Sequence, residues 1–562
     1  MRFSRRRALG LAGALTVAPA LAAADSGRPE KPSISFDHGI ASGDPLRDRV
    51  ILWTRVSGQS RPVTVTWQIA RDEAFQDIVG AGRLTTDAGR DHTVKVEATG
   101  LDPATDYWYR FRAGEITSPA GRTRTLPDDT DRVVLAMVCC SLYSNGYFNG
   151  YRAVADLAEV DAVVHLGDYI YEYGSGPMAY GMGNGRLLGR IPEPAHDTVT
   201  LDDYRLRHAQ YKRDPDLQAA HARAPWICVF DDHEICDNPW KGGAANHHPG
   251  EGPWAARKAA AIKAYREWLP IRDPAGPLSE NQAETVYRTF RFGRLAELFM
   301  VETRLLARSK QLDYSRDVPL DSRGEPDFNA FRARLEDPSR ELFGATQRQW
   351  LDTTLKASVS DGVQWQVLSS QVLMARVTGP DLNPLLAAAQ PAVALAPAAT
   401  RLHLDMLGQV FHQDPPLPLN LDAWDGYPAE RERLYAMLKS AGARPVVVSG
   451  DSHCAWANQL HDAAGDMVAV EIGVTAISSP THWLDAWLPD LHVADVLATR
   501  NDEVVAADDG HNGFVRLTLT PEDVQAEWMA LDTITSRSFR CAPARTFVAE
   551  AQAAGTTPWR QA

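Results

Sequence analysis

The sequence predicts an α/β protein preceded by a smaller all-β domain. Between residues 34 and 126, polar and apolar residues alternate in short segments separated by turn residues, as in β-strands. From about residue 130, apolar strand-like runs alternate with segments of helical periodicity, as in an α/β domain. The length of 562 residues also exceeds the roughly 100–200 residues typical of one domain. We therefore expect a β-sandwich domain over residues 34–126 and an α/β domain over residues 130–545.

The all-β domain is expected to contain strands at residues 63–70, 92–101 and 106–114. The stretch LDPATDYWYRF, at residues 101–111, resembles the turn and tyrosine strand of fibronectin-like and immunoglobulin-like sandwiches. Because no obvious chemistry lies in this region, we expect the domain to pack against the larger one or to shape its substrate site.

The first 24 residues are expected to be a cleaved export signal. The segment opens with four arginines, continues with a short apolar run and ends in small residues near position 24. Its SRRRALGL core resembles a bacterial twin-arginine signal, which directs folded proteins across the membrane. We therefore expect a periplasmic or secreted protein with the twin-arginine export machinery as a partner. An uncleaved anchor is the alternative, although the apolar run is shorter than the ~20 residues of a membrane span.

Composition indicates a soluble globular protein that is not embedded in a membrane. Hydrophobic residues make up 44% and charged residues 23% of the chain. The formal charge is −14, and loss of the four signal arginines makes it −18. Such a chain repels polyanions, so no nucleic-acid partner is expected beyond a possible phosphodiester substrate. Six cysteines without a CxxC pair do not indicate a disulfide framework.

Four apolar strands of the α/β domain each lead into a residue that can bind a metal. RVVLAMVC leads to Cys140, DAVVHLG to Asp168, APWICVFD to Asp232 and RPVVVSG to Asp451. Loops beyond the carboxyl ends of strands form the active crevice of open α/β sheets, so these four side chains are expected in one site. Strands near 290–303 and 363–371 are expected to extend this sheet, and helices are expected at 150–160 and 254–269.

Neighbouring residues supply further ligand types. Tyr171 follows in GDYIY and His453 in SGDSH, while DDHE places His233, a protonatable group, beside Asp232. Carboxylate and phenolate oxygens suit hard cations such as Ca²⁺ or Fe³⁺, whereas thiolate and imidazole favour a transition metal. The mixed set predicts two or more metals of different character, an arrangement suited to phosphoryl transfer.

Motifs spread over nearly the whole mature chain resemble the alkaline phosphatase D (PhoD-like) metallophosphatase family. The segments that carry the resemblance are GIASGDPLRDRVILWTRV, CSLYSNGYFNGYRAVA, HLGDYIYEYG, TLDDYRLRHAQYKRDPDLQAAHARAPWICVFDDHE, WQVLSSQVLMA, DAWDGYPAERERL and VVVSGDSH. This family resembles the purple acid phosphatases in its GD-x-x-Y element. The resemblance implies a calcineurin-like metallophosphoesterase sheet sandwich flanked by helices.

The resemblance also implies a ferric ion held by Cys140, Asp168, Tyr171 and His453. The doubled cysteine leaves Cys139 as an alternative to Cys140 for the thiolate ligand. Because the SLY segment follows Cys140 directly, we expect Cys140 to be the ligand.

By the same resemblance, Asp168 bridges to a Ca²⁺ site completed by Asp232 and Asp451, and His233 assists the leaving group. Some relatives imply a further Ca²⁺, whose ligands the sequence does not assign. Glu302 stands where the family commonly has aspartate, and residues 385–399 form an expected insertion; both are expected at the rim of the site.

The function implied is that of a secreted phosphatase that hydrolyses phosphate monoesters, diesters or both by a metal-bound hydroxide or oxide. One alternative is a phospholipase D-like phosphodiesterase on the same scaffold. The other is a non-catalytic periplasmic protein that binds metal or phosphate. The natural ester and the oligomeric state stay open.

Several nearby segments are expected to play supporting roles. Tyr169 and Tyr173 are expected to pack in the interior rather than to bind metal. Residues 200–217 are expected to form a solvated helix that supports the site. Residues 241–253 are expected to form a glycine-rich loop at the mouth of the site, where His247 or His248 contacts substrate in the alternative interpretation.

Overall fold

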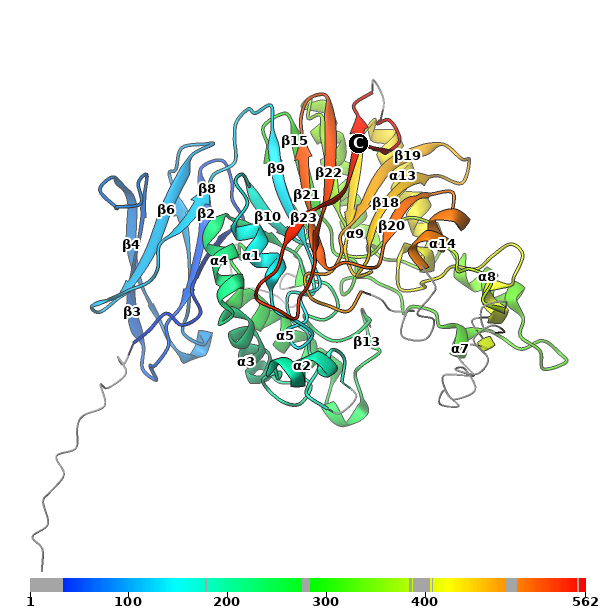
Figure 1. The fold of residues 1–562 in the computed structure, drawn as a ribbon, viewed down its shortest axis with the longest axis horizontal. Coiled ribbons are helices and arrows are strands. Elements are labelled where there is room, and N and C mark those ends of the chain that lie inside the picture. Colours follow the sequence, from blue (N-terminus) through cyan, green and yellow to red (C-terminus); the bar gives the residue numbers. More distant parts are fainter. Residues whose placement is uncertain are drawn as a thin grey trace, which may run out of the picture.

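The computed structural model describes residues 34–176, 179–274, 284–383, 387, 405–406, 408–481, 493–552 and 555–562 (Figure 1). The predicted signal at 1–24 and all but residue 387 of the expected insertion lie outside these ranges. None of the helices in the described ranges combines the length and the apolar character needed to cross a membrane.

A ten-stranded mixed sheet forms the first layer of the α/β domain. Its strand order is β24-β23-β22-β21-β9-β10-β11-β1-β2-β5, and β9, β10, β11 and β1 are parallel. All six residues of β9 are buried, as expected for a parallel strand covered on both faces. The bounds in this order are Arg560–Gln561, Cys541–Glu550, Asp523–Leu531, Gly513–Leu519, Val133–Val138, Ala162–His165, Trp226–Cys228, Ile40–Gly43, Arg49–Arg55 and Thr93–Thr99.

A seven-stranded sheet forms the second layer. Its order is β14-β15-β16-β17-β19-β18-β20, and its bounds in this order are Arg288–Phe292, Ala296–Met300, Trp365–Ser369, Pro445–Ser449, Met467–Gly473, Ala455–His461 and Val504–Asp508. The strand that leads to Asp451, β17, belongs to this second sheet, and the expected strands near 290–303 and 363–371 extend it. The expectation that all of these strands share one sheet with β9, β10 and β11 is therefore wrong. Apolar residues of both sheets, such as Leu135 and Val446, share one core cluster, so the two sheets pack on each other and bury apolar side chains between them.

The N-terminal region forms an all-β layer that shares strands with the larger domain. A five-stranded antiparallel sheet contains β4, β3, β6, β7 and β8, with bounds Ile78–Thr86, Val63–Ala70, Asp106–Ala113, Ile116–Thr117 and Gly121–Arg124. Its Tyr107 and Phe111 pack in one core cluster with Val50 and Leu52 of β2. Because β1 pairs with β11, the ten-stranded sheet runs without interruption from the N-terminal region into the α/β domain.

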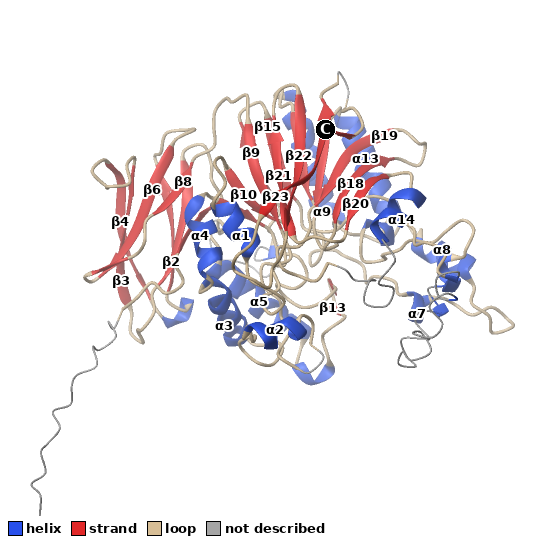
Figure 2. Cartoon of the chain, in the orientation of Figure 1, coloured by secondary structure: helices blue, strands red, loops and turns tan. Residues whose placement is uncertain are grey.

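Helices cover the outer face of the seven-stranded sheet and the loop region below both sheets (Figure 2). Helices α9, α13 and α14, at Gly344–Ser360, Pro428–Ala441 and Val493–Arg500, share a core cluster with the seven-stranded sheet. Below the sheets lie α2, α3 and α5, at Met182–Leu188, Leu201–Lys212 and Trp254–Trp268. Helices α1 and α4, at Asn149–Ala155 and Pro215–Arg223, pack against the ten-stranded sheet, because Tyr151 and Leu217 belong to the core cluster of its strands. The smaller elements are α7 and α8, at Tyr314–Asp317 and Phe328–Leu335, the hairpin β12–β13, at Pro239–Trp240 and Gly243–Ala244, and 3-10 helices at Ala88–Arg90, Pro249–Glu251 and Trp424–Gly426.

The expected single helix at 200–217 is two helices, because Asp214 and Pro215 start a new one. The Asp214 carboxylate accepts hydrogen bonds from the N–H groups of Asp216 and Leu217, at 3.0 and 3.4 Å. Pro215 occupies the first helical position, where its missing N–H costs nothing.

Candidate metal centre

The turn after β10 places Asp168 at the carboxyl end of the ten-stranded sheet. Gly167 has φ 121°, and a Cβ atom at this position would lie 2.2 Å from the Cβ of Asp231. Both the backbone conformation and the close approach therefore require glycine. Asp168 itself has φ 59°, and its N–H donates to the Glu234 carboxylate at 2.9 Å. The carboxylate of Glu234 thus stabilises an unfavourable backbone conformation next to the site.

The same left-handed conformation recurs at other residues of the centre. Cys140, Asp451 and His453 have φ values of 58°, 62° and 59°. Non-glycine residues rarely adopt this conformation, and such strain concentrates where backbone must aim a functional side chain.

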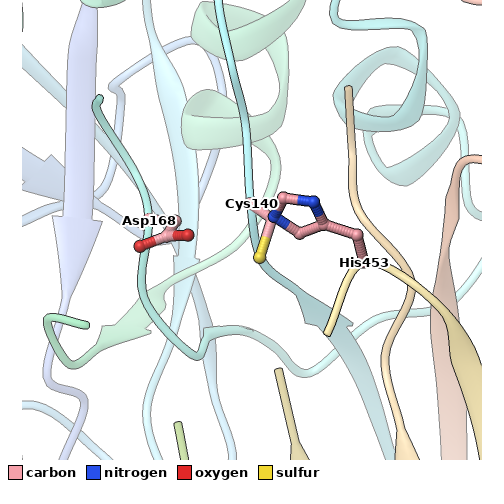
Figure 3. Close-up of side chains that lie close together, drawn as sticks. All are labelled: Cys140, Asp168 and His453. Atoms are coloured by element: carbon pink, nitrogen blue, oxygen red, sulfur yellow. The ribbon is translucent and has the colours of Figure 1, made fainter. Parts of the chain in front are cut away.

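Cys140, Asp168 and His453 place one ligand atom each within 4.8 Å of one another (Figure 3). Tyr171 joins this cluster, because its hydroxyl donates to Asp168 Oδ2 at 2.9 Å and lies 3.2 Å from His453 Nε2. Burial lowers the pKa of His453 to about 4, so its ring is neutral and able to bind metal. The four residues that were expected to hold a ferric ion therefore converge in the structure.

The two adjacent cysteines point to different surroundings. The Cys139 thiol lies 3.4 Å from the carbonyl oxygen of Val474, outside the ligand clusters found among the described residues. The Cys140 thiol lies in the cluster with Asp168 and His453. The geometry therefore favours Cys140 over Cys139 as the thiolate ligand.

Two further clusters adjoin the first one. Asp168, Asp232 and His233 form one, and Asp231, Asp232 and Asp451 form the other, so Asp168 and Asp232 each belong to two clusters. All the carboxylates that were expected to bind Ca²⁺ lie here. Sharing of ligands allows one buried centre to hold more than one cation.

His233 is oriented by a carboxylate that the sequence analysis did not identify. Its Nδ1 lies 2.7 Å from Glu172 Oε2, and its ring stacks on Tyr171 with centroids 4.2 Å apart. Its Nε2 lies 3.8 Å from Asp232 Oδ2, facing the carboxylate cluster. Burial lowers the pKa of His233, but the carboxylates of Asp232 and Glu172 outweigh burial and raise it well above 6.5.

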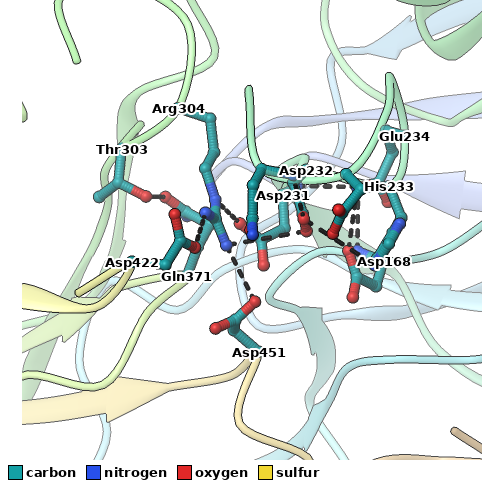
Figure 4. Close-up of polar contacts among 12 residues, drawn as sticks. Asp168, Asp231, Asp232, His233, Glu234, Thr303, Arg304, Gln371, Asp422 and Asp451 are labelled. Atoms are coloured by element: carbon teal, nitrogen blue, oxygen red, sulfur yellow. Dashed lines mark hydrogen bonds and ion pairs between the residues drawn. The ribbon is translucent and has the colours of Figure 1, made fainter. Parts of the chain in front are cut away.

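Arg304 is another functional residue that the sequence analysis did not identify, together with its partners Asp231 and Asp422. Its guanidinium pairs with Asp231 and Asp422, donates to Asp451 at 2.9 Å and lies 3.7 Å from Asp232 (Figure 4). It is fully buried, and it connects loops that follow β11 and β17, strands of different sheets. Arg304 stands in the VETRLLARSKQL segment, but no local pattern in that segment indicates these distant partners.

The donor set fits cations. Asp232 Oδ1 is buried without a hydrogen-bond partner, an arrangement that leaves a carboxylate oxygen free for a metal. Burial, reinforced by the nearby Asp232 carboxylate, raises the pKa of Asp231 well above its usual value and that of Asp451 to about 7. Arg304 lowers both but does not cancel the effect, so the carboxylates need further positive charge to be ionised together.

The structure also places the residues with expected supporting roles. Tyr169 lies in the core and hydrogen-bonds His221 at 2.9 Å, as expected, whereas Tyr173 is only half-buried and lies 5.2 Å from the His233 ring. Glu302 is fully buried, with its carboxylate accepting the N–H of Arg304 at 2.7 Å, so it positions that residue and does not line the rim.

The two histidines of the glycine-rich loop form contacts within the loop. His247 Nε2 lies 3.1 Å from the carbonyl oxygen of Gly252, and the backbone N–H of His248 donates to Glu251 at 2.9 Å. Neither histidine belongs to the ligand clusters of the described residues. Asn246 of the same loop donates to Glu172 at 3.1 Å, so the loop contacts the group that orients His233.

Two packed sheets whose strand ends carry buried carboxylates, two histidines and a thiol define an α/β enzyme with a candidate metal centre. The model of the PhoD-like phosphatase family matches residues 135–528, and that of the PhoD-like phosphatase N-terminal domain matches residues 20–127. The chain therefore belongs to the PhoD-like phosphatase family and is a phosphoric ester hydrolase. This confirms the resemblance and the fold class expected from the motifs.

A curated relative and a solved structure are each similar to nearly the whole chain. The chain is 32% identical over 561 residues to "Alkaline phosphatase D" of Bacillus subtilis (strain 168), covering 96% of this chain and 85% of that protein. It is also similar to a solved structure, "Structure of PhoD", with a TM-score of 0.76 and 30% identity over 95% of this chain and 93% of the other.

The Gly167→Ala substitution is expected to lower phosphatase activity at least about 100-fold, because the new Cβ must displace either the Asp168 turn or Asp231. Hydrolysis of p-nitrophenyl phosphate measures this loss. Gly114→Ala is the control, since Gly114 also has a positive φ, 57°, but nothing lies within 4 Å of the added Cβ. Equal losses in the two variants would show that backbone strain alone, and not the contact with Asp231, is responsible.

Proposed function

We propose that the protein is an exported metal-dependent phosphatase that hydrolyses phosphate monoesters, diesters or both. The observation that supports this most is the sharing of Asp168 and Asp232 among three ligand clusters at the ends of two sheets. Adjacent cations neutralise phosphate oxygens, polarise the phosphoryl group and activate water for attack on phosphorus. The chain has a formal charge of −14, so such cations also offset the repulsion of an anionic substrate.

The residues divide into two ligand sets of different chemical character. We propose that Cys140, Asp168, Tyr171 and His453 hold Fe³⁺, since phenolate and carboxylate oxygens suit a hard trivalent ion and the thiol and imidazole suit a transition metal. The oxygen-only set of Asp168, Asp232 and Asp451 suits Ca²⁺. A further Ca²⁺ is part of this proposal without assigned ligands.

His233 is the proposed proton donor to the leaving group. Its Nδ1 is held by Glu172, so its Nε2 stays turned toward the carboxylate cluster where the ester must lie. A proton held at Nε2 can pass to the ester oxygen as the bond to phosphorus breaks. Glu172 keeps the ring in one orientation throughout and stabilises its protonated form.

The His233→Asn variant tests this role. An asparagine amide can still reach Glu172, but it cannot donate the proton that Nε2 supplies, so kcat is expected to fall about 10²–10⁴-fold. The rates are measured with a phosphate monoester and a phosphate diester, together with metal content. His412→Ala, which removes an exposed histidine paired with Asp381, is the control. Unchanged rates in His233→Asn would contradict the role, and wild-type protein that is fully loaded with metal but cleaves neither ester would contradict the function.

The Tyr171→Phe variant tests the ferric site. Iron bound by a tyrosinate produces a visible charge-transfer absorption, so the purified wild-type protein is expected to be coloured and to contain iron and calcium by elemental analysis. The variant is expected to lose that absorption while it keeps most of its calcium, because the Tyr171 hydroxyl is a proposed ligand of the ferric site alone and the three carboxylates proposed for Ca²⁺ stay in place. A colourless wild-type protein with full metal occupancy would remove Tyr171 or iron from the proposal.

The site of action is proposed to be the periplasm or the cell exterior, with export by the twin-arginine route. The arginines that support this stand in the SRRRALGL segment. Replacing Arg5 and Arg6 together by lysine is expected to leave the active enzyme in the cytoplasm, as cell fractionation and activity assays would show. Export that continues unchanged in this variant would exclude the twin-arginine route.

A further inference from the structure

Two tyrosine rings lie on the solvent side of the candidate metal centre. The rings of Tyr173 and Tyr180 meet edge to face with centroids 5.9 Å apart. Tyr173 lies 5.2 Å from the ring of His233, the proposed proton donor. The Tyr180 hydroxyl lies 3.2 Å from His453 Nδ1, and its ring centroid is 6.5 Å from that of Tyr171. The pair therefore adjoins both the proposed proton donor and the proposed ferric ligands.

Packing of the interior does not account for this pair. The core clusters of the described residues include Tyr169 but none of Tyr171, Tyr173 and Tyr180, so it is exposure that separates the pair from Tyr171. Tyr180 is 38% exposed, whereas Tyr171 is 1% exposed. An aromatic side chain with this much exposed surface beside a reacting centre is available to contact substrate.

The position of the rings indicates which part of a substrate they contact. The phosphoryl group of an ester must lie near Asp168 and Asp232, so an organic group attached to it extends past His233 or His453 toward the exterior. Tyr173 adjoins the first of these histidines and Tyr180 the second. Faces and edges of aromatic rings favour a planar ring through offset stacking or edge-to-face contact.

We propose that Tyr173 and Tyr180 form a binding subsite for a planar ring in the organic group of the ester, so that the enzyme favours benzyl, aryl and nucleoside esters over purely aliphatic ones. This inference rests on the proposed phosphatase function for its kinetic consequence. The stacking itself is a binding property, so it can be measured without turnover.

The kinetic test compares esters that differ only in aromaticity. Benzyl and cyclohexylmethyl phosphate have similar size and similar leaving groups, and so do the corresponding symmetrical diesters. In a symmetrical diester both organic groups are the same, so either of them can contact the tyrosines. The metal-loaded wild-type protein is expected to show a KM at least about fivefold lower for the benzyl esters, the low end of measured stacking contributions. Tyr180→Leu is expected to bring the two KM values together.

The control is Tyr180→Phe, which keeps the ring and removes only the hydroxyl. His453 Nδ1 retains its contact with the carbonyl oxygen of Pro480, 3.0 Å away, so the histidine stays oriented. This variant is expected to keep the preference for benzyl esters. If Tyr180→Phe loses the preference as fully as Tyr180→Leu does, the hydroxyl and not the ring is responsible, and the subsite is excluded.

A binding experiment separates this inference from the proposed function. Calorimetric titration of the metal-loaded protein with benzylphosphonate and cyclohexylmethylphosphonate, which are not hydrolysed, is expected to show at least about fivefold tighter binding of the benzyl compound. A preference in binding without hydrolysis of any ester would overturn the proposed function and support the subsite. Equal binding of both phosphonates, or a preference that persists in Tyr180→Leu, would overturn the subsite even if the enzyme is active.

Discussion

The candidate site depends on the buried Arg304 guanidinium. This one side chain contacts Asp231, Asp232, Asp422 and Asp451, which stand on loops following different strands. Removing one partner of a buried ion pair commonly costs about 3–5 kcal/mol, because the other charge is left without compensation. Arg304 therefore holds together a group of carboxylates that would otherwise repel one another.

A single guanidinium does not balance the surrounding negative charge. The raised pKa values of Asp231 and Asp451, caused mainly by burial, show that the carboxylates remain difficult to ionise together even beside Arg304. Cations relieve this cost, so the same feature that makes the centre unfavourable on its own makes it attractive to metals. The left-handed backbone at Cys140, Asp168, Asp451 and His453 is a second unfavourable feature of the centre. The packed sheets support these conformations, which the isolated loops would avoid.

The centre has an inner and an outer part with different tasks. The ligands and Arg304 form the inner part, while the rings of Tyr173 and Tyr180 lie on its solvent side, Tyr173 next to His233 and Tyr180 next to His453. Chemistry at phosphorus and selection of the organic group can therefore be changed separately.

Local features of the sequence determined the strands that lead into the candidate site and the family motifs. Each apolar strand that leads into Cys140, Asp168, Asp232 or Asp451 is visible in the sequence, because burial on both faces requires continuous apolar residues and a ligand must follow where the strand leaves the core. The family motifs could be recognised for the same reason, since each consists of residues adjacent in the chain.

Only the tertiary structure decided how these strands are distributed and which other groups join them. The first three strands belong to the ten-stranded sheet and the fourth to the seven-stranded sheet, a choice made by strand pairing between distant segments. Arg304 and Asp422 are 118 residues apart, and Glu172 and His233 are 61 apart, so no spacing in the sequence indicates that they meet. Orientation likewise selects Cys140 over Cys139, because two adjacent thiols look alike until the backbone turns one of them toward Asp168 and His453. Contacts of this kind depend on the packing of whole sheets, and that packing is a property of the complete fold.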